Sequence, residues 1–396
     1  ESCLDLCSHS LGLQPKRTKT LVSQVLDEWA NRGSLTYRHP GVTNIFSDLD
    51  LAERLGRIIG AHKDEVAVMN SLTVNLNLLL TSFYTPTQER HKILLEESTF
   101  PTNYFACESH INNHKKYLVN ESLFLLRPGQ DELFHTKDIL NIIEMEGDSI
   151  ALVMLSGVQY LTGQLLDMEV ITKAAHKKGC KVGFDLAQAI GAVELSLHDW
   201  EVDFAVWGNF KFMNCGPGAI GGAFMHRKHV HNNFPKLLGW WGYDIATRFN
   251  FTPQLDPLPG INGYRNSAPS PLNLACLAAS LEIFEKTTIR KLRKKSILLN
   301  RQVQANVPLT HLILLLQLSS YGVKMISPSD FTQRGCQMTV RLEKFDTKKV
   351  HQRLKDNAVN CSFKDPDMIR ISPNPFYTRF WDVYRFYQVF QTVLKN

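Results

Sequence analysis

Three features of the sequence could cooperate in one reaction. Residues 70–73 (Asn-Ser-Leu-Thr) follow an apolar run and open a helical pattern, so backbone N–H groups and a hydroxyl there could bind an anion. Asp185 ends another apolar run, where its carboxylate could hold a cationic ring nitrogen. Lys211 lies between Phe210 and Phe212, and burial there would lower the pKa of its ammonium group and favour attack on an aldehyde.

Each feature also has a simpler explanation. Residues 70–73 or Asp185 could cap a helix, and Lys211 could rest its stem on apolar surface with its charge in water. The order of the three features favours shared chemistry, because Lys211 follows Asp185 by 26 residues, near the end of the next apolar run. Phosphate, ring nitrogen and aldehyde are the three groups through which proteins bind pyridoxal 5'-phosphate (PLP).

Other chemistries lack their usual motifs. The chain has no G-x-S-x-G, H-E-x-x-H or Walker A sequence, and residues 216–222 are typical of a tight turn between strands. The eight cysteines are scattered without paired metal-ligand spacing, so we predict no metal site and reduced thiols in a cytoplasmic protein.

Short apolar runs alternate with helical patterns between about residues 65 and 226. The runs are continuous, which is typical of strands buried on both faces. We predict strands at 65–69, 92–96, 123–126, 150–155, 181–185 and 203–207, and helices at 72–83, 136–146 and 167–178. This alternation predicts an α/β fold with a mostly parallel sheet covered on both sides, in which ligands bind beyond the carboxyl ends of the strands.

The pattern changes after Pro-rich stretches at 253–259 and 269–271. A long helix through Leu281 and Phe284, strands at 337–342 and 368–371, and helices at 347–354 and 381–394 predict a smaller α+β domain. An amphipathic segment at 20–29 is expected to pack with it. We therefore divide the chain into an N-terminal segment (1–45) that packs with the small domain, a large domain (46–265) and a C-terminal small domain (266–396).

Composition narrows the possible partners. The chain has 396 residues, of which 44% are hydrophobic and 21% are charged, as in ordinary globular proteins. The net charge of +6 is spread without a basic block, which disfavours a nucleic-acid surface. No apolar run approaches the ~18 residues needed to cross a membrane. The first residues show neither a basic n-region nor an apolar h-region, so we do not expect secretion, and the chain begins at Glu1 rather than Met, as a piece of a longer chain would.

The chain resembles the kynureninase family of fold-type I PLP enzymes, in the aminotransferase class V superfamily. The resemblance extends from Ser10 to about Leu394, except for residues 307–321. It rests on the motifs SLGLQP (10–15), LTVN (72–75), GDSI (147–150), FDLA (184–187), LHDW (197–200), LGW (238–240), TRF (247–249) and IR (369–370). The family fold implies a large PLP-binding domain with a mostly parallel mixed sheet and a smaller α+β domain.

The resemblance implies a reaction and a set of site residues. The family hydrolyses L-kynurenine and 3-hydroxykynurenine to anthranilate or 3-hydroxyanthranilate plus alanine. By position, Lys211 would hold PLP and move the Cα proton, Asp185 would pair with the ring nitrogen, and Arg370 would clamp the substrate carboxylate. The other implied cofactor contacts are Leu72, Thr73, Phe100, Pro101, Thr102, Asn103, Ser156, Gln188, Phe210, Trp240 and Ala268. Trp240 would come from the partner subunit, which implies a homodimer with a shared active site.

Five positions depart from the family pattern. Asn103 replaces an Asp, Gln188 a His, Phe210 a Tyr, Ala268 an Asn and His9 an Asn. Loss of the Tyr and Asn contacts to the phosphate would weaken cofactor binding by about 3–6 kcal/mol. Phe210 has no ionisable group, and loss of a general acid typically costs roughly 10²–10⁴-fold in rate.

These departures leave alternatives to an active kynureninase-type hydrolase. One is a degenerate family member that retains the fold, with or without PLP, and has little or no turnover. Another is a cysteine desulfurase, which shares the fold and needs a nucleophilic cysteine on a loop. Cys336 is the candidate for that role, although it immediately precedes a predicted strand.

Overall fold

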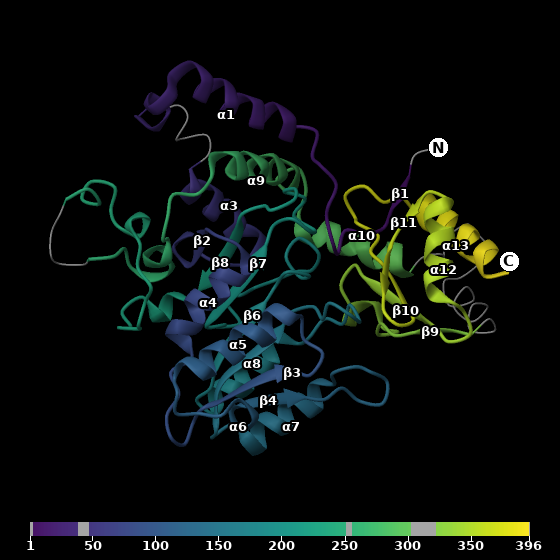
Figure 1. Cartoon of the computed structure of the whole chain (residues 1–396), viewed down its shortest axis with the longest axis horizontal. Coiled ribbons are helices and arrows are strands. Elements are labelled where there is room, and N and C mark those ends of the chain that lie inside the picture. The colour runs from purple at the N-terminus through teal and green to yellow at the C-terminus, as the bar shows by residue number, and fades with distance from the viewer. Residues whose placement is uncertain (1–2, 39–46, 251–255, 302–321, 396) are drawn as a thin grey trace.

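The computed structural model describes residues 3–38, 47–250, 256–301 and 322–395 of the chain (Figure 1). The segment 307–321, where the family resemblance fails, lies outside the described residues. The described residues form three sheets, of seven, four and two strands.

The larger sheet has the strand order β2–β8–β7–β6–β5–β3–β4. Its strands are β2 (Val66–Val68), β3 (Lys92–Glu96), β4 (Leu123–Leu126), β5 (Ile150–Ser156), β6 (Lys181–Asp185), β7 (Phe204–Gly208) and β8 (Gly221–Met225). Strand β8 runs antiparallel to both of its neighbours, β2 and β7, and all other pairs in this sheet are parallel. The predicted α/β class with a mostly parallel mixed sheet is therefore confirmed.

Strand β8 is a difference from the sequence-based prediction. The turn predicted at 216–222 overlaps the start of this strand. The strand was not predicted because Gly221 and Gly222 interrupt the apolar pattern. A Cβ atom at Gly222 would lie 2.5 Å from the Trp207 ring of the neighbouring strand. Glycine is therefore needed here for close packing within the sheet, although glycine is not typical of strands in sequence.

Helices cover both faces of the larger sheet (Figure 1). They are α3 (Asp48–Ile59), α4 (Leu72–Phe83), α5 (Pro101–Asn113), α6 (Val119–Ser122), α7 (Thr136–Glu146), α8 (Met168–Lys177) and α9 (Pro271–Phe284). Alternate strand side chains enter different cores: Leu94 and Val153 pack in the core that includes residues of α3, α7, α8 and α9. Ile93 and Leu152 pack in the core that includes residues of α4 and α5.

The smaller sheet is antiparallel, with the order β12–β13–β10–β9. Its strands are β9 (Val323–Met325), β10 (Met338–Leu342), β12 (Ser362–Lys364) and β13 (Met368–Ile371), and the helices that follow α9 are α10 (Ile289–Arg301), α12 (Thr347–Asp356) and α13 (Phe380–Lys395). A separate core contains residues of this sheet, α12 and α13. The α+β character predicted for this part is present.

The N-terminal segment contacts both parts of the structure. Strand β1 (Leu4–Asp5) pairs in parallel with β11 (Val359–Asn360). Helix α1 (Thr18–Arg32) instead packs on α9, and its Leu21 and Val25 are buried in one of the cores of the larger sheet. The predicted domain boundaries at residues 45 and 265 stay predictions.

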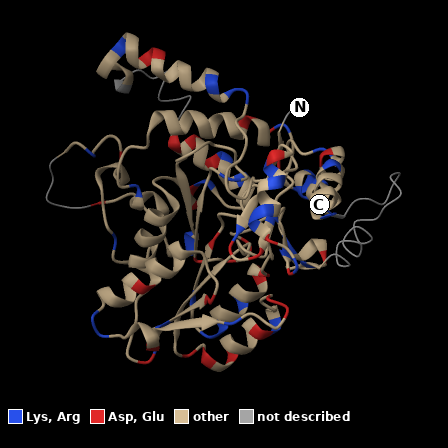
Figure 2. Cartoon of the chain, turned by 45° about the vertical axis from the view of Figure 1, so that its right-hand side comes forward, with Lys and Arg blue, Asp and Glu red and all other residues tan. Residues whose placement is uncertain are grey.

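Several 3₁₀ turns complete the described structure: η1 (Gly33–Arg38), η2 (Lys63–Glu65), η3 (Arg227–His229), η4 (Trp240–Gly242), η5 (Gly260–Tyr264) and η6 (Phe331–Gln333). Basic and acidic residues are interspersed over the molecule (Figure 2), in keeping with the absence of a basic block in the sequence. Within the described ranges, no helix combines the length and apolar character that crossing a membrane requires.

Candidate active site

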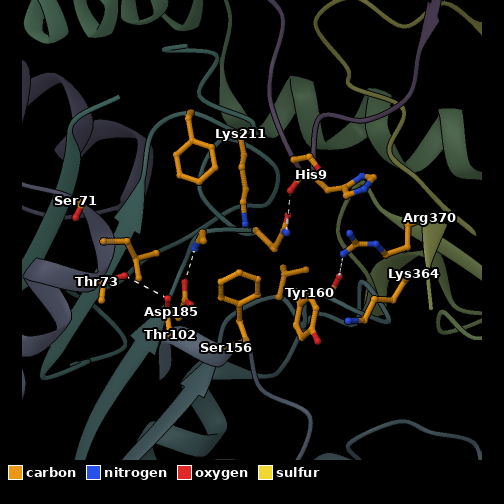
Figure 3. A pocket seen from close by; sticks show the side chains of 17 residues that line it. His9, Ser71, Thr73, Thr102, Ser156, Tyr160, Asp185, Lys211, Lys364 and Arg370 are labelled. Carbon is orange, nitrogen blue, oxygen red and sulfur yellow. Dashed lines mark hydrogen bonds between the residues drawn. The ribbon is translucent and has the colours of Figure 1, made fainter. Parts of the chain in front are cut away.

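A cavity of about 480 Å³ lies where the carboxyl ends of β5, β6 and β7 face the smaller sheet (Figure 3). Strand pairing brings these ends together, because Ser156 pairs with Asp185 and Asp185 pairs with Val206. Ten of the residues predicted for the site line this cavity: Leu72, Thr73, Phe100, Thr102, Ser156, Asp185, Gln188, Phe210, Lys211 and Arg370.

Lys211 extends into the cavity from the loop after β7 (Figure 3). Its Nζ lies 5.6 Å from the centre of the Phe210 ring and 5.8 Å from that of Phe100. Burial lowers the pKa of this ammonium group to about 8, and the positive charge of Arg370 adds to the effect while Asp185 opposes it. The solvated-surface explanation is therefore wrong, and a substantial neutral fraction of the amine is available near physiological pH.

Asp185 is buried at the end of β6, and both of its oxygens have protein donors. Oδ1 accepts the N–H of Ala187 at 2.8 Å, and Oδ2 accepts the side-chain N–H of Asn103 at 3.0 Å. The capping explanation is thus partly correct, since one oxygen binds the following turn. The same carboxylate also lines the cavity, where it can accept a hydrogen bond from a cationic ring.

The first turn of α4 presents its N-terminus to the cavity. Ser71 occupies the N-cap position but makes no side-chain capping hydrogen bond, so the simple capping explanation is not supported. Leu72 and Thr73 line the cavity, and the Thr73 hydroxyl lies 3.3 Å from the Thr102 hydroxyl at the start of α5. A helix N-terminus with two adjacent hydroxyls is a suitable site for an anion.

Arg370 approaches the cavity from β13 of the smaller sheet. Its Nε donates to the Ser362 hydroxyl at 3.1 Å, and one terminal nitrogen donates to the Tyr160 carbonyl at 3.0 Å. These bonds hold the guanidinium across the cavity from the strand ends that carry Asp185. A carboxylate bound there would be recognised by a positioned, planar cation.

Four predicted residues do not line the cavity. Asn103 lies behind it and reaches it through Asp185, and Pro101 begins α5 at an exposed position. Trp240 is 45% exposed and contacts Trp241 and Phe249, while Ala268 is also exposed. The predicted contributions of Trp240 and Ala268 need a second subunit and stay predictions.

Sequence reasoning missed Glu96, a fully buried acid next to the site. Its carboxylate accepts the backbone N–H and the hydroxyl of Ser156, both at 3.2 Å. Burial raises the pKa of Glu96 to about 7, and the negative charge of Asp185 contributes to the rise. Glu96 ends strand β3 just as Asp185 ends β6, so the same signal could have found it.

Tyr160 and Lys364 are further lining residues that the sequence did not indicate. Tyr160 follows β5, and its ring meets the Phe100 ring edge to face with centroids 5.3 Å apart. Lys364 ends β12 and adds a second cation beside Arg370. Neither residue belongs to a local motif, and only packing of the two sheets brings them to the cavity.

The residues that line the cavity fit PLP. An amine with a lowered pKa, a strand-end carboxylate and an uncapped helix N-terminus share one cavity. One buried acceptor oxygen of a lining residue, Gln188 Oε1, has no hydrogen-bond partner in the described part of the chain. A polar group bound in the cavity is one way to satisfy such atoms.

Cys336 does not have the environment that a desulfurase nucleophile needs. It is buried before β10, its sulfur lies 3.2 Å from the Ser296 hydroxyl, and burial raises the pKa of its thiol. No cysteine is among the described residues that line the cavity. The cysteine desulfurase alternative therefore has no support from the site.

Comparison with known proteins places these observations in a family. Residues 292–390 match the family model of the kynureninase C-terminal domain. The chain is 43% identical to "Kynureninase" of Rattus norvegicus and 42% identical to that of Homo sapiens, in each case over 100% of this chain and 85% of the relative. It is 41% identical to "Kynureninase" of Koribacter versatilis, over 97% of this chain and 89% of that protein.

Solved structures resemble the chain in fold. The apo cysteine desulfurase of Thermococcus onnurineus NA1 superposes with a TM-score of 0.78 at 16% identity, over 99% of this chain and 95% of that one. The cystine C–S lyase C-DES, in complex with its product cysteine persulfide, gives a TM-score of 0.79 at 15% identity, over 98% and 97%. At such low identity the likeness concerns the fold alone.

Proposed function

The chain belongs to the kynureninase family, and we propose that it is a PLP-dependent hydrolase that cleaves the Cβ–Cγ bond of L-kynurenine or 3-hydroxykynurenine. The products are anthranilate or 3-hydroxyanthranilate and L-alanine, which places the enzyme in tryptophan catabolism and NAD biosynthesis. The observation that carries the proposal is that Lys211, Asp185 and Arg370 share one cavity. The relatives named above support the same activity.

Lys211 has two roles in this proposal. Its neutral amine, favoured by the lowered pKa, would hold the cofactor through the cofactor's aldehyde. The same amine lines the cavity, where it would move a proton at the substrate Cα. Because Phe100 and Phe210 flank its Nζ, bulk water has limited access to the amine.

The remaining residues orient the cofactor and the substrate. Asp185 would hold the ring nitrogen in its protonated form, the α4 N-terminus with Thr73 and Thr102 would bind the phosphate, and Phe100 would pack on the ring. When bound, PLP supplies an electron sink for the bonds that break at the substrate. Arg370 holds the substrate carboxylate, which fixes the position of Cα relative to Lys211.

The test combines a spectrum with an activity assay. Purified protein given PLP is expected to turn yellow, to carry the cofactor on Lys211 after borohydride reduction, and to release fluorescent anthranilate from L-kynurenine. Lys211→Ala is the control and should do none of these. A colourless protein without a Lys211 adduct would refute the cofactor site, whereas a yellow protein without anthranilate release would indicate the degenerate alternative.

A homodimer with a shared active site is the assembly that we propose. The segment before the undescribed residues 251–255, at the left of Figure 1, exposes large apolar side chains: Leu237, Trp240, Ile245 and Phe249. Exposed apolar clusters of this kind commonly mark protein interfaces. Sedimentation of the holoenzyme should give twice the monomer mass of 45.1 kDa. We also propose a cytoplasmic location, which the cysteine usage of the sequence supports.

A further inference from the structure

Three histidine rings gather around a buried acid at the β2 edge of the larger sheet, and none of them lines the cavity. His62 caps η2, His198 lies in the loop between β6 and β7, and His226 directly follows β8. The rings of His62 and His198 meet edge to face with centroids 4.3 Å apart. His198 and His226 stack in parallel at 4.8 Å.

Glu65 is the acid at the centre of this cluster, and its side chain is fully buried. Oε1 lies 2.9 Å from His198 Nδ1 and accepts the backbone N–H of Arg227. Oε2 accepts the backbone N–H of His62. Potential metal-binding atoms of His62, Glu65 and His198 all lie within 4.8 Å of one another. Two imidazoles thus face one carboxylate.

We propose that His62, Glu65 and His198 bind one divalent transition-metal ion, with zinc as the best match. Imidazole nitrogen and carboxylate oxygen are ligands that Zn²⁺ accepts at about 2.0–2.2 Å, and three protein ligands leave a fourth position for water. The ion replaces the Nδ1 proton between His198 and Glu65, and that proton moves to Nε2 or, from the imidazolium form, to solvent. His62 is exposed, so its ring can turn inward to complete the site.

Hydrogen bonds also position the ring that stacks on His198. His226 Nδ1 accepts the backbone N–H of Lys228 at 3.0 Å, and its Nε2 lies 3.2 Å from the His198 carbonyl, so hydrogen bonds hold the stacked ring against His198. The guanidinium of Arg227, whose positive charge would repel a metal ion, lies 3.9 Å from Glu65. It is paired with the carboxylate of Asp64 at 2.9 Å, which offsets this charge.

The expected effect of the ion is on stability. Glu65 immediately precedes β2, and the loop of His198 joins two other strands of the same sheet. A bound ion therefore ties together segments that are 133 residues apart in sequence. No ligand of this site belongs to the proposed catalytic residues, so its loss should leave kynurenine turnover unchanged.

The test uses PLP-loaded enzyme freed of metal with a chelator and then titrated with zinc by calorimetry. Wild type should bind one zinc ion. The affinity of His62→Ala for zinc should be lower by roughly tenfold or more. Zinc should raise the melting temperature of wild type but not of His62→Ala, and magnesium, which prefers oxygen ligands, should have no effect.

His231→Ala is the matched control, because His231 is an exposed histidine outside the cluster. It should bind zinc like wild type. Equal zinc affinity of wild type and His62→Ala would place the ion elsewhere, for example on the exposed Cys3, and would overturn the proposal. Absence of zinc binding in wild type would overturn it as well.

Discussion

Phe210 is the predicted departure from the kynureninase pattern that lies nearest to the proposed chemistry, directly before Lys211. It lines the cavity with Thr73 and the α4 N-terminus, where the cofactor phosphate is proposed to bind. A hydroxyl added to this ring can donate a hydrogen bond to a charged group, which contributes about 1.5–3 kcal/mol. Phe210 itself cannot form such a hydrogen bond, because its ring has no hydroxyl.

Phe210→Tyr should therefore tighten PLP binding by roughly tenfold or more and raise anthranilate release, with a further gain from Ala268→Asn. Cofactor affinity is measured by titration of the visible absorbance, and turnover by product fluorescence. Phe105→Tyr, at an exposed position outside the cavity, should change neither. Unchanged affinity in Phe210→Tyr would show that other groups already satisfy the phosphate.

Glu96 should make stability depend on pH. Its pKa is raised from 4.5 to about 7 in the folded protein. Between these values the folded state keeps a proton that the unfolded chain loses, so the free energy of unfolding falls as the pH rises through this window. The full difference is about 3 kcal/mol.

Glu96→Gln should remove this dependence, because the amide has no proton to lose. Denaturant unfolding of both proteins between pH 4.5 and 8 provides the measurement, and the difference between them cancels the groups that they share. Wild type should lose stability relative to Glu96→Gln as the pH rises to 7 and show no further relative loss above it. Parallel curves would contradict a protonated Glu96.

At the scale of elements, the N-terminal segment joins the two sheets beside the cavity. His9 is buried, with ring nitrogens 2.7 Å from the Ser362 hydroxyl and 2.8 Å from that of Ser372 in the smaller part. Three residues later, Gly12 donates its N–H to the Phe210 carbonyl at 2.9 Å. The segment therefore fixes the loop that carries Lys211 relative to the strands that carry Arg370.

Gly12→Ala should disturb this junction. A Cβ atom there would overlap the Lys211 carbonyl and the Asn214 side chain, and overpacking typically costs 1–3 kcal/mol. We expect a lower melting temperature and weaker PLP retention after gel filtration. Leu11→Ala, at an exposed neighbouring position, should behave like wild type. Normal PLP retention in Gly12→Ala would show that the loop moves without consequence.

The elements also show what sequence can predict. Helices α4 and α7 match their predicted bounds, because apolar spacing and flanking polar residues mark both ends. Strands β9 and β12 were missed because they are only three residues long and partly exposed. Within the site, Asp185 and Lys211 had local signals. Tyr160 had none, because it reaches the cavity only through long-range packing.

At the scale of the whole molecule, one chain builds most of the cavity from three separated regions. The N-terminal segment supplies His9 and Ser10, the larger sheet supplies the carboxyl ends of its strands, and the smaller sheet supplies Lys364 and Arg370. Trp240 and Ala268 lie outside the cavity of their own chain. If they belong to the site, they must enter the cavity of a second copy.

Subunit complementation tests this arrangement. In a twofold dimer of Lys211→Ala with Trp240→Ala, one site carries both substitutions and the other carries neither. Mixing equal amounts of the two variants under conditions that exchange subunits gives half heterodimers, so activity should recover to about a quarter of wild type. Each variant alone should be strongly impaired. Activity of the mixture that equals the mean of the separate variants would mean that each chain completes its own site, and Trp240 would then act only within its own surface segment.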